Sequence, residues 1–184
     1  MNLAQATQFH LSLSLEILKG CQYNCKGCHV EKSAGHITQD QADLLGRWLD
    51  SMQQEGNYLP TLVFIAPTDF LSASNTVEIL SDPRVRNVLT KFRRLSLQTT
   101  YLDISKIHEV KEVLDKHYQH MELELNFVIE PEHIENEKYL SKIIDNRKKV
   151  YEILDWPMPV LSFCILNVYE YDRIKKSNVK KILN

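Results

Sequence analysis

Apolar and polar residues alternate strictly in two segments of the chain, the period-two pattern of a strand with one buried face. The odd-numbered positions are apolar in residues 9–18 and again in residues 121–129. The even positions of the second segment are Glu122, Glu124, Asn126 and, as the exception, Val128. Residues 62–66, 94–100 and 159–169 are also typical of strands. The pattern therefore predicts five strands.

Between these strands, apolar residues recur three and four positions apart, which indicates helices. We expect helices over 38–55, 105–118 and 135–154, a helical stretch interrupted at Asp82-Pro83, and a basic helical tail over 171–184. Thr38 and Gln41 have the spacing of a capping box at the start of the first helix. Arg147, Lys148 and Lys149 are expected on the exposed face of the long helix. The apolar stripe of the first helix is predicted to be Leu44, Leu45, Trp48, Leu49 and Met52.

Strands that alternate with helices predict βα units, a parallel sheet and right-handed connections. Strands buried on both faces are usually apolar throughout, whereas two of these strands are polar on one face. We therefore expect an α/β fold whose helices cover the apolar face of a curved sheet and leave a polar concave face. Glu16, Glu122 and Glu124 would crowd that face or pair with basic residues of neighbouring strands. An antiparallel sheet remains the alternative, although no hairpin connection is evident.

The composition is that of a globular protein, with 43% hydrophobic and 25% charged residues among 184, and we expect a single domain. A net charge of −2 gives no electrostatic reason to expect nucleic acid as a partner. No apolar run approaches the length of about 18 residues that spans a membrane. The first residues also lack the pattern of a secretory signal. We therefore expect a cytoplasmic protein with no membrane partner.

Three of the four cysteines, Cys21, Cys25 and Cys28, form a C-x3-C-x2-C motif directly after the first predicted strand. Thiolates select iron–sulfur clusters, zinc or copper(I). Structural zinc takes four protein ligands, and the fourth cysteine, Cys164, lies far away in the last predicted strand, where we expect a small core residue. Three thiolates on a [4Fe–4S] cluster leave one iron open for a substrate or cofactor. A zinc-binding loop remains the alternative.

This motif, at this place in a βα series, resembles the radical S-adenosylmethionine (SAM) superfamily. The resemblance implies a partial, open βα barrel of about five to six mainly parallel strands over residues 9–170. It implies a [4Fe–4S] cluster on Cys21, Cys25 and Cys28, whose fourth iron binds SAM. One-electron reduction, by a donor of the flavodoxin or ferredoxin type, then cleaves SAM to methionine and a 5′-deoxyadenosyl radical that abstracts hydrogen from the substrate.

The resemblance also implies SAM contacts at the ends of later strands. In APTDFL, Asp69 stands where the family often has the acidic residue of Gly-Gly-Glu-Pro, and Pro67-Thr68 replace its glycines. Thr99-Thr100-Tyr101 stands where the family often has Thr-Asn-Gly. Further contacts are implied in the fourth and fifth strands. The residues expected to contact SAM are Thr68, Asp69, Thr99, Asn126, Ile165 and Asn167.

The chain departs from the family in its glycines, all five of which lie at or before Gly56. The glycine motifs of later strands are therefore absent. Two alternatives stay open: a degenerate member that binds SAM without cleaving it, and a non-catalytic module that holds zinc or an iron–sulfur cluster. A chain of this length has little room for a capping domain, which favours a peptide or protein substrate whose own surface completes the site.

Overall fold

The computed structural model describes residues 9–16, 18, 38–54, 58–66, 69–129, 131–155, 160–165 and 176–183. These residues form an α/β fold. Its strands are β1 (Phe9–Glu16), β2 (Tyr58–Ala66), β3 (Arg94–Thr99), β4 (Glu122–Ile129) and β5 (Val160–Ile165). Its helices are α1 (Gln39–Gln54), α2 (Thr76–Ser81), α3 (Pro83–Leu89), α4 (Ile107–His117), α5 (Pro131–Glu135), α6 (Glu137–Leu154) and α7 (Lys176–Leu183). None of the described helices is long and apolar enough to cross a membrane.

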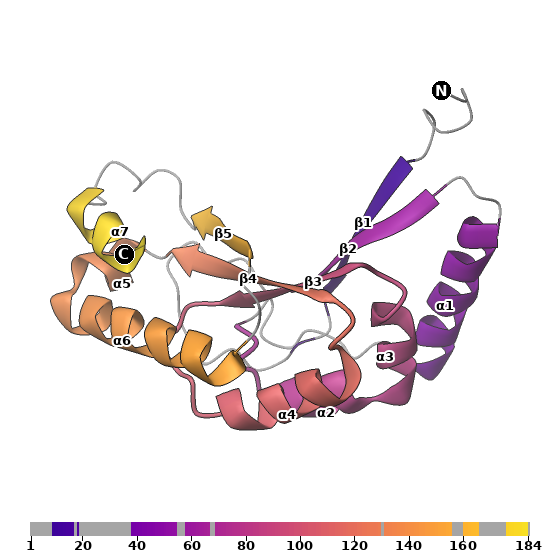
Figure 1. The fold of residues 1–184 in the computed structure, drawn as a ribbon, viewed down its shortest axis with the longest axis horizontal. Helices are drawn as coiled ribbons and strands as arrows, with labels where there is room; N and C mark the ends of the chain where they lie inside the picture. Colours follow the sequence, from indigo (N-terminus) through magenta and orange to yellow (C-terminus); the bar gives the residue numbers. More distant parts are fainter. Residues whose placement is uncertain are drawn as a thin grey trace.

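The five strands form one sheet in the order β1-β2-β3-β4-β5, and every pair of neighbours is parallel. The predicted parallel α/β arrangement is confirmed, and the antiparallel alternative is wrong. When strands follow one another in chain order, connections of one hand bring every helix to the same face. Figure 1 shows α1, α3, α4 and α6 along one side of the sheet. Among the described residues β1 pairs only with β2 and β5 only with β4, so this sheet is open.

The two faces of the sheet differ in chemistry as the alternation predicted. Residues in register in neighbouring parallel strands point to the same face. The pairs Leu95–Leu123 and Leu97–Leu125 lie in the core cluster beneath the helices. The pairs on the other face are Arg94–Glu122, Ser96–Glu124 and Gln98–Asn126. We call this second face, across β3 and β4, the polar face.

Strand β2 begins at Tyr58, four residues before the predicted start. The predicted start at Leu62 was wrong, because pairing with β1 extends the strand through Pro60, which has no N–H for a sheet hydrogen bond. In the structure, the register shifts between Leu11 and Ser12, so that Leu11 pairs with Pro60 and Ser12 with Leu62. Thr61 is the extra residue of this bulge, and its Oγ1 donates to the Leu11 carbonyl at 3.0 Å. The bulge lets the strand continue past the proline.

The helix predicted over 135–154 is confirmed as α6, and the short helix α5, which the sequence did not predict, precedes it. Asn136 separates them as the N-cap of α6, and its side-chain oxygen accepts from the backbone N–H of Lys138 at 3.1 Å. Asn is among the preferred N-cap residues because its oxygen satisfies a free N–H of the first turn. Pro131 begins α5, a position where the missing proline N–H has no intrahelical partner in any case.

The capping box at the start of α1 is confirmed, because the N–H of Thr38 donates to Gln41 Oε1 at 2.9 Å and the N–H of Gln41 to Thr38 Oγ1 at 3.3 Å. The apolar stripe of α1 is only partly correct. Leu49 is buried, whereas Leu44 is 62% and Trp48 45% exposed. The buried side of α1, which faces α3 and β2, is therefore narrower than predicted.

The basic run in α6 is also only partly on the exposed face. Lys148 and Lys149 are exposed, but Arg147 is half-buried. Its Nη1 donates to the carbonyl of Ile182 in α7, and its guanidinium lies 5.1 Å from the centre of the Tyr151 ring. The prediction for Arg147 was wrong because α7 returns across α6, a contact that local periodicity does not show.

Candidate functional site

The candidate site lies at the carboxyl edge of the sheet, where all five parallel strands end together. The chain leaves β1 at Glu16, and the three motif cysteines follow within residues 19–37, which lie outside the described residues. Thr68 and Asn167 also lie outside them. Ile165 is the last residue of β5. Asp69, Thr99 and Asn126 are the predicted contacts whose side chains the structure describes.

Asp69, directly after β2, is buried with 4% of its surface exposed. Its Oδ2 accepts two hydrogen bonds from Thr100, one from the backbone N–H at 2.7 Å and one from the hydroxyl at 2.5 Å. Its Oδ1 accepts from the N–H of Leu71 at 2.9 Å. Phe70, next in the chain, donates its N–H to the Gln98 carbonyl at 2.8 Å. The carboxylate therefore clamps the loop after β2 to the end of β3.

Burial raises the pKa of Asp69, and hydrogen bonds from Thr100 and Leu71 act in the opposite direction. Desolvation disfavours the charged carboxylate, whereas N–H and O–H donors favour it. Because both oxygens are held by donors of the protein itself, the observed role of this side chain is to join two loops at the carboxyl edge. A direct contact from Asp69 to SAM stays a prediction.

Thr99 ends β3 and is fully buried, and its Oγ1 accepts from the N–H of Tyr101 at 3.0 Å. Tyr101 has a left-handed backbone, with φ of 58°. It stands at the place where the radical SAM superfamily, which the cysteine motif resembles, often has glycine. That conformation costs a residue with a side chain about 1–2 kcal/mol. The buried ring compensates by packing 5.4 Å from that of Phe127, and the Tyr101 carbonyl accepts from Asn146 Nδ2 at 2.7 Å.

Sequence reasoning assigned no role to Tyr101. The signal available to it was the missing glycine itself, because a bulky residue in a glycine position must be held there by its surroundings. In this protein the buried tyrosine makes that turn part of the core. The turn at the end of β3 is therefore set by packing between β3, β4 and α6.

On the polar face, arginines neutralise the glutamates of β4. Arg94 Nη2 lies 3.1 Å from Glu122 Oε2, and its Nη1 lies 3.4 Å from Glu124 Oε2. Ser96 donates to Glu124 Oε1 at 3.3 Å. Arg93 adds a contact of 2.7 Å to Glu122, and these hydrogen bonds from Arg93 and Arg94 lower the pKa of Glu122. Of the two arrangements the sequence left open, Glu122 and Glu124 adopt pairing with basic residues.

Asn126 lies on the polar face between Gln98 of β3 and Ser162 of β5. Its Oδ1 is buried and has no hydrogen-bond partner among the described residues. A buried acceptor without a donor is destabilising by about 1–3 kcal/mol. Asn126 Oδ1 is therefore an acceptor on the polar face, in the second half of β4, with no donor among the described residues.

Within the part of the chain that the structure describes, no group of three or more His, Cys, Asp or Glu side chains could hold a metal ion. The three motif cysteines lie outside that part.

Comparisons with protein-family models, with curated proteins and with solved structures found no match to this chain.

Proposed function

We propose that this protein is a radical SAM enzyme. The observation that carries the proposal is the place of the C-x3-C-x2-C motif, directly after the first strand of a parallel sheet whose strands follow chain order. In barrels built from βα units, active sites lie at the carboxyl ends of the strands. Cys21, Cys25 and Cys28 belong to the connection that leaves this edge of the sheet after β1.

The donor set of the motif fits a [4Fe–4S] cluster, because three thiolates are soft ligands that leave one iron available to SAM. Cys21, Cys25 and Cys28 would hold the cluster. Reduced by a flavodoxin- or ferredoxin-type donor, the bound cofactors supply a 5′-deoxyadenosyl radical for hydrogen abstraction. We propose that Asn126 Oδ1, which has no donor among the described residues, accepts from a donor group of SAM, such as a hydroxyl or its ammonium.

The remaining residues of the edge position and shield this site. The Asp69 clamp keeps the loops after β2 and β3 together, and the buried Tyr101 ring fills the turn behind them. Arg93 and Arg94 together balance the charges of Glu122 and Glu124, so this group adds little net charge to the polar face. An open sheet also leaves space for a peptide or protein substrate to complete the barrel wall, and we propose a substrate of this class and a cytoplasmic setting for the enzyme.

The test is anaerobic reconstitution with iron and sulfide, reduction with dithionite, addition of SAM, and chromatographic detection of 5′-deoxyadenosine. We expect about four irons per chain and product formation that each of C21A, C25A and C28A abolishes. The matched control is C164A, which changes the cysteine outside the motif and should retain cluster and product.

Two outcomes would contradict the proposal. A chain that takes up a single zinc ion would be a zinc-binding module. A complete cluster that yields no 5′-deoxyadenosine, and whose EPR spectrum does not change when SAM is added, would indicate a non-catalytic or degenerate module.

A further inference from the structure

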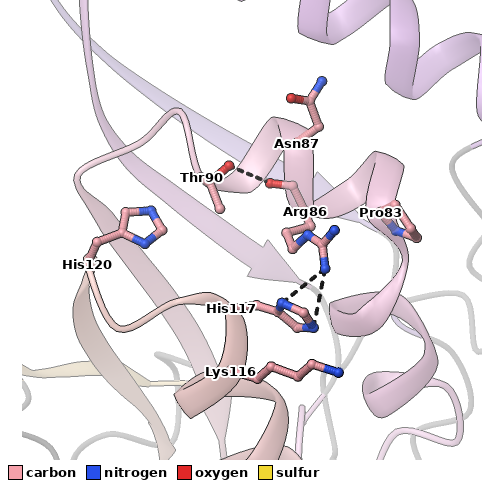
Figure 2. Close-up of a pocket in the computed structure, with 7 residues that line it drawn as sticks. All are labelled: Pro83, Arg86, Asn87, Thr90, Lys116, His117 and His120. Atoms are coloured by element: carbon pink, nitrogen blue, oxygen red, sulfur yellow. Dashed lines mark hydrogen bonds between the residues drawn. The ribbon is translucent and has the colours of Figure 1, made fainter.

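A separate cavity of about 500 Å³ lies between α3 and the end of α4. Because α3 leads into β3 and α4 into β4, the cavity is near the amino ends of these strands, away from the carboxyl edge. Figure 2 shows the side chains around it. The lining residues are Pro83, Arg86, Asn87, Thr90, Lys116, His117 and His120.

Arg86 and His117 form the centre of the cavity wall. Arg86 Nη1 lies 3.0 Å from Nδ1 and 3.3 Å from Nε2 of the His117 ring, and Figure 2 shows the guanidinium directed at that ring. The Arg86 carbonyl accepts from Thr90 Oγ1 at 2.8 Å, which closes the last turn of α3. The Arg86–His117 contact leaves other N–H groups of the guanidinium available, because arginine has five donors.

The lining is one-sided in charge, with two cations and two histidines and no carboxylate, although the chain as a whole has a net charge of −2. Burial lowers the pKa of His117, and the charges of Arg86 and Lys116 lower it further. Asp82, next to the lining residue Pro83, is paired with Arg84 at 2.5 Å. The C-terminal ends of α3 and α4 each contribute a partial negative charge of roughly −0.5. The full positive charges of Arg86 and Lys116 outweigh these two partial charges.

We propose that this cavity binds the phosphate group of a small phosphorylated molecule, with Arg86 and Lys116 contacting the phosphate oxygens. A guanidinium presents parallel N–H donors that match phosphate oxygens, and lysine adds a point charge. The volume is in the range of sites for small molecules, so the rest of a nucleoside monophosphate would fit beside the phosphate. The cavity is a local hollow on a chain of net negative charge, which favours a small molecule over a nucleic-acid strand. The proposal is independent of the radical SAM assignment.

The test is calorimetric titration of the full chain with three probes: inorganic phosphate, AMP and a short single-stranded oligonucleotide. We expect AMP to bind more tightly than inorganic phosphate. Both should bind more tightly than the oligonucleotide. R86Q and K116Q should each weaken AMP binding about tenfold or more, because a charged hydrogen bond is lost. K148Q makes the same charge change on the exposed face of α6 and should leave binding unchanged.

A second measurement keeps the test independent of variant folding. In NMR titrations of the unmodified protein, saturating AMP should raise the pKa of His117, because the bound anion offsets Arg86 and Lys116. R86K keeps the positive charge but loses the parallel N–H donors of the guanidinium, so this variant should bind AMP less tightly than the unmodified protein. The proposal is overturned if AMP leaves His117 unchanged, if K148Q weakens binding as much as R86Q, or if the oligonucleotide is the tightest ligand.

Discussion

Replacement of Asp69 by Asn tests the clamp at the carboxyl edge with the smallest change of shape. The aspartate accepts three hydrogen bonds, two from Thr100 on Oδ2 and one from Leu71 on Oδ1. Asn has a single acceptor oxygen, and the Thr100 hydroxyl can rotate to accept from the new amide. In either amide orientation, however, one backbone N–H, of Leu71 or of Thr100, faces the NH₂ group and loses its partner.

The expected loss of stability follows from that count. A buried N–H left without an acceptor costs about 1–3 kcal/mol, so D69N should lower the free energy of unfolding by about that amount at neutral pH. T100V removes the hydroxyl, which donates to Asp69 and also accepts from the N–H of Leu102 at 3.4 Å, and should cost about 1–2 kcal/mol. The two changes affect one network, so the loss in the double variant should differ from the sum of the single losses.

The loss should also depend on pH, with a defined sign. Burial raises the pKa of folded Asp69 above its ordinary value of 3.8, so the folded protein binds this proton more tightly than the unfolded chain does. The resulting stabilisation is complete below the ordinary pKa and is lost as pH rises through the raised one. The stability difference between the unmodified protein and D69N should therefore be largest in acid and shrink as pH increases.

Urea unfolding of both proteins across that pH range measures the difference directly. The control is D103N, whose Oδ1 accepts from the N–H of Ser105 at 2.9 Å in a more exposed part of the following loop. D103N should change the unfolding free energy by less than about 0.5 kcal/mol. A D69N protein as stable as D103N at neutral pH, or a difference that grows as pH rises, would refute this account of the clamp.

Three further changes test individual contacts. R94Q should raise the pKa of Glu122 toward its ordinary value of 4.5, which a carboxyl NMR titration measures, and an unchanged pKa would mean that Arg93 alone holds this charge. Y101F removes a buried hydroxyl whose neighbour is the side chain of Tyr151 but which makes no hydrogen bond of good geometry to the described residues, so thermal unfolding should show stability changed by less than about 1 kcal/mol, and a larger loss would mean that the two tyrosines are hydrogen-bonded. N136A removes the N-cap of α6 and should lower the unfolding free energy by about 1 kcal/mol. K138A, two residues later, keeps the backbone N–H that the cap accepts from and should leave the unfolding free energy unchanged.

The fold class and most elements could be predicted because they depend on residues close together in the chain. Alternation of apolar and polar residues marked β1 and β4, and the spacing of Thr38 and Gln41 marked the start of α1. Where the prediction was wrong, the outcome depended on a contact with an element distant in the sequence. The contact with α7 buries part of Arg147, and pairing with β1 extends β2 past Pro60.

For the candidate site, the sequence supplied the residue types, and the structure supplied their partners. The cysteine motif could be selected from its spacing and its place after the first strand, and Asp69 only from the resemblance to the radical SAM family. That Asp69 is held by Thr100, and Glu122 and Glu124 by Arg94, could not, because several partners of suitable charge and size exist for each carboxylate.

By itself, the sequence determined which residues of a strand share a face, because backbone pleating sends successive side chains to opposite sides whatever the neighbouring strands are. It therefore determined that the sheet has an apolar and a polar side. Only the tertiary structure decided the order of the strands and the contacts between their ends, such as Asp69 with Thr100 and Arg86 with His117. Each of these pairs is separated by 31 residues. Such contacts depend on how whole elements pack together, and no local pattern in the chain encodes them.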